Sequence, residues 1–165
     1  MLMNSGFKIS KMLVKNRFSS LSLVNTMKMF ATSRKYTHDH EWVEFNANTN
    51  EGKIGITSYA QEQLGDIVFV DLPEPGTSHN KGDSMCGIES VKTAADLYAP
   101  AKLEIIERNE NLSSNPGLLN TASETDGWIF KVKIESEREL GDLMSEEDYR
   151  KFVEEAKAAH WDQPL

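Results

Sequence analysis

Polar and apolar residues alternate over several short stretches of this chain, a pattern typical of β-strands that bury one face. Residues 41–45 and 53–57 show it on either side of a segment rich in turn formers, and together they predict a hairpin. Residues 67–72 are mostly apolar and are followed by Pro73, so we expect a buried strand that ends there. Four further strands are predicted at 84–91, 93–99, 102–108 and 128–134.

A short helix is predicted at 58–64. Ser58 is placed to cap its N-terminus, Gln61 stands three residues later at the capping-box position, and Gly65 follows as a stop. Residues 109–120, by contrast, are polar, rich in Asn and interrupted by a Pro-Gly pair, so we expect a loop there.

A second helix is predicted near the end of the chain, at about 145–157. Ser145 is its N-cap, and Asp148 occupies the capping-box position. One side of this helix is apolar and consists of Tyr149, Phe152, Val153 and Ala156. We expect the helix to cover the core and to have no other role.

Two stretches of the chain resemble each other. Residues 65–72 and 127–134 both begin with Gly and share Ile and Val at matching offsets. Together with the many short strands, this similarity predicts a mainly β fold, a sandwich of antiparallel strands built from two similar halves.

Charge is divided unevenly along the chain. Residues 1–35 contain seven of the 18 basic residues, six serines and no Asp or Glu, whereas 36–165 carries all 26 acidic residues. The basic start is typical of an organelle transit peptide, and we expect its removal near residues 28–35; a basic tail without a targeting role is the alternative. The rest, 36–165, is then one acidic domain, which disfavours nucleic acid and anionic membranes and favours basic surfaces of partner proteins.

Other side chains carry weaker signals. Cys86 is the only cysteine, so no internal disulfide is possible, and we interpret it as a small buried residue rather than a nucleophile. His38 and His40 alternate but lack the Cys or carboxylate spacing of a zinc site, so we expect no bound metal. No stretch reaches the roughly 18 apolar residues of a membrane-spanning helix.

Lys92 lies between two predicted strands, with no Gly, Pro or Asn at the turn. A hairpin there holds the lysine amine away from the body of the domain, where a modifying enzyme can acylate it. A lone exposed lysine is most often only a surface charge, however, so its position alone does not identify a function.

The residues around Lys92 carry more information. The segment Glu89-Ser90-Val91-Lys92 resembles the lipoylation segment of glycine cleavage H proteins. Biotin carriers typically place Met on both sides of their lysine, and lipoyl domains of 2-oxo-acid dehydrogenases usually place Asp before it, whereas Val91 and Thr93 stand here. The resemblance covers nearly all of 36–157, in matching order and spacing, through His40-Glu41-Trp42, Gly55-Ile56-Thr57, Ala60-Gln61, Leu64-Gly65-Asp66, Leu72-Pro73, Pro75-Gly76, Asn115-Pro116-Gly117-Leu118, Asp126-Gly127-Trp128 and Met144-Ser145-Glu146-Glu147.

This resemblance implies a lipoyl/biotinyl-type barrel-sandwich hybrid with an internal helix and a C-terminal helix, and lipoate attached covalently to Lys92. The implied protein is a non-catalytic, monomeric carrier of the mitochondrial matrix. It receives lipoate from lipoylating enzymes. It then takes an aminomethyl group from a pyridoxal-phosphate glycine decarboxylase to a folate-dependent aminomethyltransferase, and reducing equivalents to dihydrolipoamide dehydrogenase. The resemblance also places Glu41 and Asp96 at the cleft for the loaded arm, although either could be an ordinary surface acid.

Two alternatives use the same lysine. A lipoyl donor that relays lipoate to other enzymes would also carry it on Lys92. An enzyme with Lys92 as a Schiff-base nucleophile would need a buried lysine, which its polar neighbours Ser90, Thr93 and Asp96 argue against. The chain also departs from the family, because Leu103 stands where a Gly is usual; we expect the turn there to be built differently or to be strained.

Overall fold

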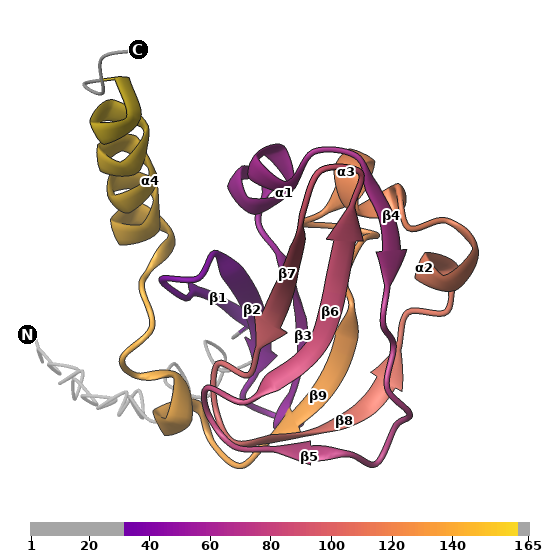
Figure 1. Ribbon diagram of the computed structural model, residues 1–165. Coiled ribbons are helices and arrows are strands. Elements are labelled where there is room, and N and C mark those ends of the chain that lie inside the picture. Colours follow the sequence, from indigo (N-terminus) through magenta and orange to yellow (C-terminus); the bar gives the residue numbers. More distant parts are fainter. Residues whose placement is uncertain (1–31, 162–165) are drawn as a thin grey trace, which may run out of the picture. The chain divides into compact units, whose positions relative to one another are not determined.

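The computed structural model describes the backbone of residues 32–161 and the side chains of 32–159. Figure 1 shows a mainly β domain with four α-helices at its periphery. The strands are β1 Thr32–Tyr36, β2 Glu41–Asn46, β3 Glu51–Ile56, β4 Ile67–Val70, β5 Ser78–His79, β6 Ser84–Ser90, β7 Ala94–Tyr98, β8 Leu103–Arg108 and β9 Phe130–Ile134. The helices are α1 Ser58–Leu64, α2 Asn111–Ser114, α3 Leu118–Ala122 and α4 Glu146–Trp161, with a 3-10 turn at Glu137–Leu140.

The strands form two antiparallel sheets that share one core. The larger sheet has the order β1-β2-β3-β9-β8-β5, and the smaller has the order β4-β6-β7. Fully buried side chains from both sheets belong to a single apolar cluster, among them Phe45, Ile54, Ile88, Leu97 and Ile105. The predicted mainly β architecture of short antiparallel strands with an internal and a C-terminal helix is therefore confirmed.

Strand β4 differs from the continuous buried strand that the sequence predicts. Ile67 and Val70 are buried, but Val68 and Phe69 are each about half exposed. The pairing of β4 with β6 shifts register between Ile67 and Phe69, so two consecutive residues face outward. The resemblance between 65–72 and 127–134 corresponds to β4 and β9, which lie in different sheets.

Helix α1 has the predicted bounds but a different cap. Thr57, not Ser58, is the N-cap: its backbone is extended and its hydroxyl oxygen accepts a hydrogen bond from the Ala60 amide at 3.2 Å. Gly65 ends the helix as predicted, with φ of 76°, a left-handed value that glycine adopts readily. Thr57 can serve as the cap because it precedes the first helical residue, whereas Ser58 lies inside the helix.

The predicted loop at 109–120 is wrong in part, because it contains α2 and the beginning of α3. Each helix is little more than one turn and buries a single leucine of the main core, Leu112 or Leu119. One apolar residue per helix produces no helical period, which is why the sequence pattern indicates only a polar segment.

Helix α4 runs beyond the predicted end, to Trp161. Ser145 caps it as predicted, since its hydroxyl oxygen accepts a hydrogen bond from the Asp148 amide at 3.2 Å. The ring of Tyr149 stacks on Tyr36 of β1, with centroids 4.5 Å apart. Two backbone hydrogen bonds between Tyr36 and Met144, of 2.9 and 3.0 Å, fix the segment that leads into the helix. Helix α4 therefore covers a second, aromatic cluster rather than the main core.

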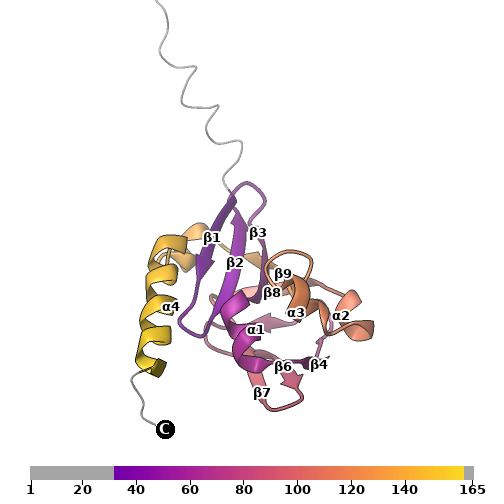
Figure 2. The ribbon, with the colours of Figure 1, turned by 90° about the horizontal axis from the view of Figure 1, so that it is seen from above.

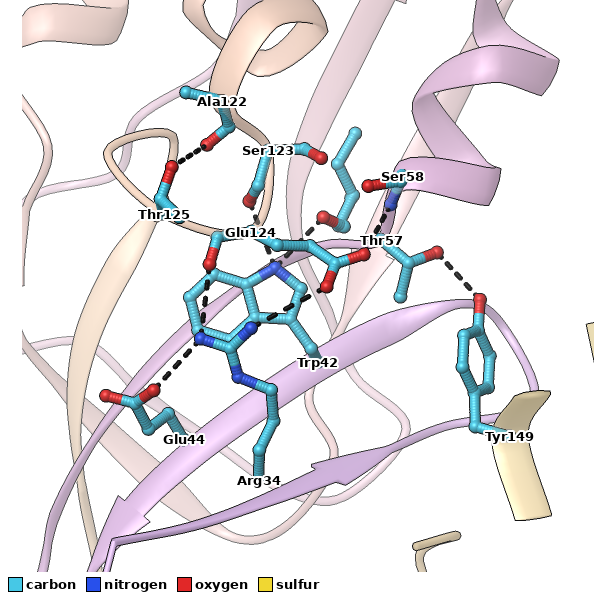
Figure 3. Close-up of polar contacts among 11 residues, drawn as sticks. Arg34, Trp42, Glu44, Thr57, Ser58, Ala122, Ser123, Glu124, Thr125 and Tyr149 are labelled. Atoms are coloured by element: carbon cyan, nitrogen blue, oxygen red, sulfur yellow. Dashed lines mark hydrogen bonds and ion pairs between the residues drawn. The ribbon is translucent and has the colours of Figure 1, made fainter. Parts of the chain in front are cut away.

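Trp42 is the centre of the polar network shown in Figure 3. Its indole N–H donates to the carbonyls of Ile56 and Ser123, at 2.9 and 3.0 Å. The Arg34 guanidinium lies 4.5 Å from the centroid of its ring and pairs with Glu44 at 2.9 Å. Residues 32–35, which the sequence places at the end of the transit segment, thus belong to the folded domain as most of β1, while 1–31 lie outside the described residues.

Leu103 begins β8 and is buried opposite Ile134 of β9. Among residues 32–161, the non-glycine residues with positive φ are His40 and Asn50. Leu103 is therefore not left-handed, and the turn before β8 is built without the conformation that a Gly at this position would permit. In the same part of the chain, no helix is long and apolar enough to cross a membrane.

Candidate functional site

Lys92 stands in the turn that joins β6 to β7, as predicted. The Ser90 hydroxyl builds this turn: it donates to the Thr93 carbonyl at 2.9 Å and accepts from the Thr93 and Lys92 amides at 3.0 and 3.3 Å. The backbone adds a hydrogen bond from the Ser90 amide to the Thr93 carbonyl at 2.8 Å. The Ser90 side chain thus stabilises a turn that contains neither Gly nor Asn, the residues more often found in turns.

The turn is attached to the segment that follows α1. The Val91 amide donates to the Asp66 carbonyl at 2.9 Å. The Lys92 side chain passes over Gly65, where an added Cβ would lie 3.2 Å from Lys92 Cε, tighter than an ordinary contact. Figures 1 and 2 both place α1 beside this turn. Lys92 and its neighbours Val91 and Thr93 are exposed, so the amine is available to a modifying enzyme.

The exposure of Lys92 bears on its chemistry. Within residues 32–161, no carboxylate lies within 4.0 Å of its amine, because the ion pairs of this region involve other residues. A Schiff-base nucleophile needs burial or a neighbouring charge to be deprotonated near neutral pH. Lys92 is exposed rather than buried, and acylation by a separate enzyme requires only that access.

Glu41 is not the ordinary surface acid that the sequence leaves open, because only 2% of it is exposed. One carboxylate oxygen accepts a hydrogen bond from the Tyr98 amide at 3.1 Å, and the other accepts from the Thr37 hydroxyl. Burial raises the pKa of the Glu41 carboxyl, and these two hydrogen bonds oppose that rise. Glu41 therefore fastens β7, the edge strand of the smaller sheet, to the start of β2.

Glu41 is among the residues that line a cavity of about 220 Å³. Tyr98, Ala99 and Pro100 also line this cavity, as do Lys81 and Asp142, which form an ion pair. Asp96 is exposed on β7, two residues before Tyr98, and its carboxylate accepts a hydrogen bond from the Ser84 hydroxyl at 3.1 Å.

Strand β7 connects the three residues that the sequence singles out. It begins two residues after Lys92, contains Asp96 and ends at Tyr98, to which Glu41 is bonded. At about 3.3 Å per residue, Tyr98 lies roughly 20 Å along the chain from Lys92. Asp96 thus lies on β7, and Glu41 of β2 is hydrogen-bonded to the end of that strand rather than to the lysine amine.

Cys86 and His40, which the sequence also singles out, take part in packing. Cys86 is buried, and burial raises the pKa of its thiol, so it is not a reactive nucleophile. His40 Nδ1 lies 2.8 Å from the Tyr149 hydroxyl, within the aromatic cluster that α4 covers. Among residues 32–161, no group of three or more His, Cys, Asp or Glu is arranged to hold a metal ion.

Sequence reasoning did not find the residues that fix the turn from outside it, Gly65 and Asp66. Their only local signal is the helix stop at Gly65, which predicts a chain reversal without showing what packs on it. The contact with Val91 spans 25 positions of the sequence and exists only once both segments are folded.

Comparisons with known proteins agree with this geometry. A family model described as "Glycine cleavage H-protein" matches residues 34–156. The glycine cleavage system H protein of Thermotoga maritima is 50% identical over 119 residues, which are 72% of this chain and 94% of that protein. The mitochondrial H protein of Pisum sativum is 41% identical over 153 residues, with 87% and 92% covered.

A solved structure provides the same comparison in three dimensions. The crystal structure of a glycine cleavage system H protein from Mycobacterium marinum superimposes with a TM-score of 0.65 at 36% sequence identity. The match covers 73% of this chain and 95% of the other. At this identity and coverage, the two proteins are similar in sequence as well as in fold.

Proposed function

The chain belongs to the glycine cleavage H-protein family, and from this premise we propose that Lys92 is the residue that carries its lipoyl group. Proteins of this family are lipoyl-bearing carriers of the aminomethyl group and have no catalytic activity of their own. The observation that supports Lys92 is its place in the structure: an exposed amine at the tip of a two-stranded hairpin whose turn is held by Ser90 and Asp66.

The residues around Lys92 suit covalent attachment. The amine has no carboxylate partner among residues 32–161, so acylation removes a charge without leaving another unpaired. Gly65 leaves room for the lysine stem, and the hydrogen-bonded turn limits how far the backbone can move. When bound, the lipoyl group supplies a disulfide that accepts the aminomethyl group on one sulfur. The protein presents that group at a defined point on its surface.

The partners follow from membership of the glycine cleavage system. We propose a pyridoxal-phosphate decarboxylase, a folate-dependent aminomethyltransferase and dihydrolipoamide dehydrogenase, with lipoylating enzymes acting first. The net negative charge of 36–165 suits basic docking sites on these enzymes. Val91, which is 76% exposed, together with Phe69 and Val68 on the adjoining β4, offers apolar contact area next to Lys92.

We assign Glu41 and Asp96 to the path along which the loaded arm rests. An arm attached at the start of β7 passes Asp96 before it reaches the cavity beside Glu41. The loaded arm carries a cationic amine, and a carboxylate with little access to water attracts such a charge more strongly than a solvated one.

The mitochondrial matrix is the compartment we propose. Relatives at 41% and 42% identity are named as mitochondrial proteins, and the basic, acid-free segment before β1 has transit-peptide composition. Bacterial relatives are equally similar, so the support comes from this segment rather than from overall identity.

Replacement of Lys92 tests the assignment. Lys92→Arg keeps the positive charge but removes the amine that lipoate acylates, so intact mass should show no lipoyl group. Glycine decarboxylation that depends on this carrier should stop, with free lipoate absent. Lys102→Arg, at another exposed lysine, is the matched control and should behave as the wild type. A lipoylated or active Lys92→Arg protein would exclude Lys92 as the attachment site.

A further inference from the structure

Asn120, near the middle of α3, makes three side-chain hydrogen bonds to residues between Gln61 of α1 and Ile67, the first residue of β4. Its amide nitrogen donates to the Gly65 carbonyl at 2.8 Å and to the Gln61 side-chain oxygen at 3.1 Å. Its carbonyl oxygen accepts from the Ile67 amide at 2.9 Å. One carboxamide thus uses both of its N–H groups and one acceptor on the end of α1 and the start of β4.

These bonds enclose Asp66. The carboxamide holds the backbone immediately before this residue, at Gly65, and immediately after it, at Ile67. The Asp66 carbonyl, fixed between them, is the group that accepts the hydrogen bond from the Val91 amide. Asn120 therefore connects to the lysine turn in two steps, first to the backbone of Gly65 and Ile67 and then through the Asp66 carbonyl to the Val91 amide.

Ile67 is the buried residue of the Gly65–Ile67 segment. Val68 and Phe69, the next residues of β4, are half exposed and do not anchor it by burial. Gly65 is left-handed and has no side chain to pack. The Val91 amide bond to the Asp66 carbonyl and the pairing of Ile67 with Ser90 join this segment to β6 and the lysine turn. Among residues 32–161, the side chain that hydrogen-bonds to this backbone from another element is that of Asn120.

We propose that Asn120 is a positioning residue for the lipoylation of Lys92. It holds the Gly65–Ile67 backbone in the place where the Asp66 carbonyl orients the lysine turn for the lipoylating enzyme. This role rests on the assignment of Lys92 as the lipoyl site and adds a second residue, 28 positions away in the sequence, to the recognition of that site.

The modification itself is an acyl transfer from lipoyl adenylate, formed by a lipoate–protein ligase from lipoate and ATP. The Lys92 amine attacks the carbonyl carbon, the bond from that carbon to the phosphate oxygen breaks, and AMP leaves as a proton is lost from the nitrogen. Asn120 takes no part in these bonds. It raises the fraction of molecules whose turn is in the recognised geometry, and that fraction sets the apparent affinity for the enzyme.

A pair of isosteric substitutions tests the role. Asn120→Asp replaces the amide that faces the Gly65 and Gln61 oxygens by a carboxylate oxygen, so two attractive contacts become repulsive. Asn109→Asp is the matched control, because the Asn109 amide donates to the Asp126 and Trp128 carbonyls at 2.9 and 2.7 Å. Asn109 is 2% exposed, so its replacement should destabilise the fold at least as much, but its side-chain hydrogen bonds go to Asp126, Trp128 and Asn111 rather than to the segment that holds the lysine turn.

The readouts are ligase kinetics with each unlipoylated protein and amide hydrogen exchange at Val91. For Asn120→Asp we expect the KM for the protein substrate to rise about three- to tenfold with kcat nearly unchanged, because the recognised geometry is less populated. Exchange at Val91 should accelerate by a similar factor. Asn109→Asp should change neither, although its melting temperature falls.

Equal KM values for wild type and Asn120→Asp would overturn the proposal, as would equal increases in both variants, since these would reflect general stability. If Asn120→Asp does not fold, the pair Asn120→Ala and Asn109→Ala, which introduces no charge, decides by the same comparison. A wild type that the ligase leaves unmodified at Lys92 contradicts the lipoyl assignment instead. In that case Val91 exchange still determines whether Asn120 holds the turn.

Discussion

The rings of Tyr36 and Tyr149 stack with their centroids 4.5 Å apart and join the first described strand to the C-terminal helix. The Tyr149 hydroxyl also lies 2.7 Å from the Thr57 hydroxyl and 2.8 Å from His40 Nδ1. One side chain thus connects α4 to β1 and to the N-cap of α1. Burial raises the pKa of Tyr149 to about 12, so this hydroxyl keeps its proton at physiological pH.

Tyr149→Phe tests this connection, because it removes the hydroxyl and keeps the stacked ring. Loss of two partly buried hydrogen bonds should lower the free energy of unfolding by about 1–2 kcal/mol. Urea denaturation measures the loss, and amide exchange should show it within α4. Tyr98→Phe, which removes a hydroxyl from an exposed ring, is the control and should change stability little. Equal effects of the two substitutions would contradict a special role for Tyr149.

The N-terminal boundary of the mature protein should lie at or before Thr32. A chain that begins at Thr32 keeps all of β1 and should be as stable as the full-length chain. A chain that begins at Thr37 lacks the Arg34 contact with Trp42 and the buried Tyr36, and should lose about 3 kcal/mol or more. Thermal or urea unfolding compares the two, and N-terminal sequencing of organelle-purified protein locates the cleavage. A mature chain that starts beyond Arg34 would show that β1 is dispensable.

Glu41→Gln should shorten the lifetime of the aminomethyl-loaded arm. The isosteric amide can keep the contacts to Tyr98 and Thr37 but lacks the charge that attracts the cationic amine. A carboxylate–ammonium pair of about 1 kcal/mol corresponds to roughly a fivefold faster release of ammonia from the isolated loaded protein. Lipoylation and reoxidation by the dehydrogenase should change little, because neither involves the cation. Glu51→Gln, at an exposed acid, is the control, and equal release rates for all three proteins would leave Glu41 without this role.

The same substitution should alter the pH dependence of stability. Burial raises the folded-state pKa of the Glu41 carboxyl above its usual 4.5, so the folded protein binds this proton more tightly than the unfolded chain does. Glu41 therefore favours the folded state below pH 4.5, and this contribution is lost as pH rises through the folded pKa. The stability of Glu41→Gln relative to wild type should accordingly increase from pH 4 to pH 7. A difference that stays constant or falls over that range would contradict the raised pKa.

Local pattern was sufficient for much of this protein. Alternation of apolar residues located several strands, though not β1 or β5, because a strand's two faces repeat every two residues. Gly65 marked the end of α1 because few other residues adopt its backbone angles. Lys92 could be placed at a turn because both flanking strands end near it. The lipoyl assignment came from resemblance to a family, since an exposed lysine by itself has no distinguishing chemistry.

The tertiary structure decided which polar groups are buried and what they hold. Glu41 is buried and accepts a hydrogen bond from Tyr98, 57 positions later, and Asn120 reaches Gly65 across 55 positions. The exposure of Val68 and Phe69 depends on a register shift against β6, which no local pattern encodes. Sequence periodicity reports only neighbours within a turn or a strand, whereas these contacts exist because chain folding brings remote backbone donors and acceptors together, and buried polar groups must then pair with whatever partner lies beside them.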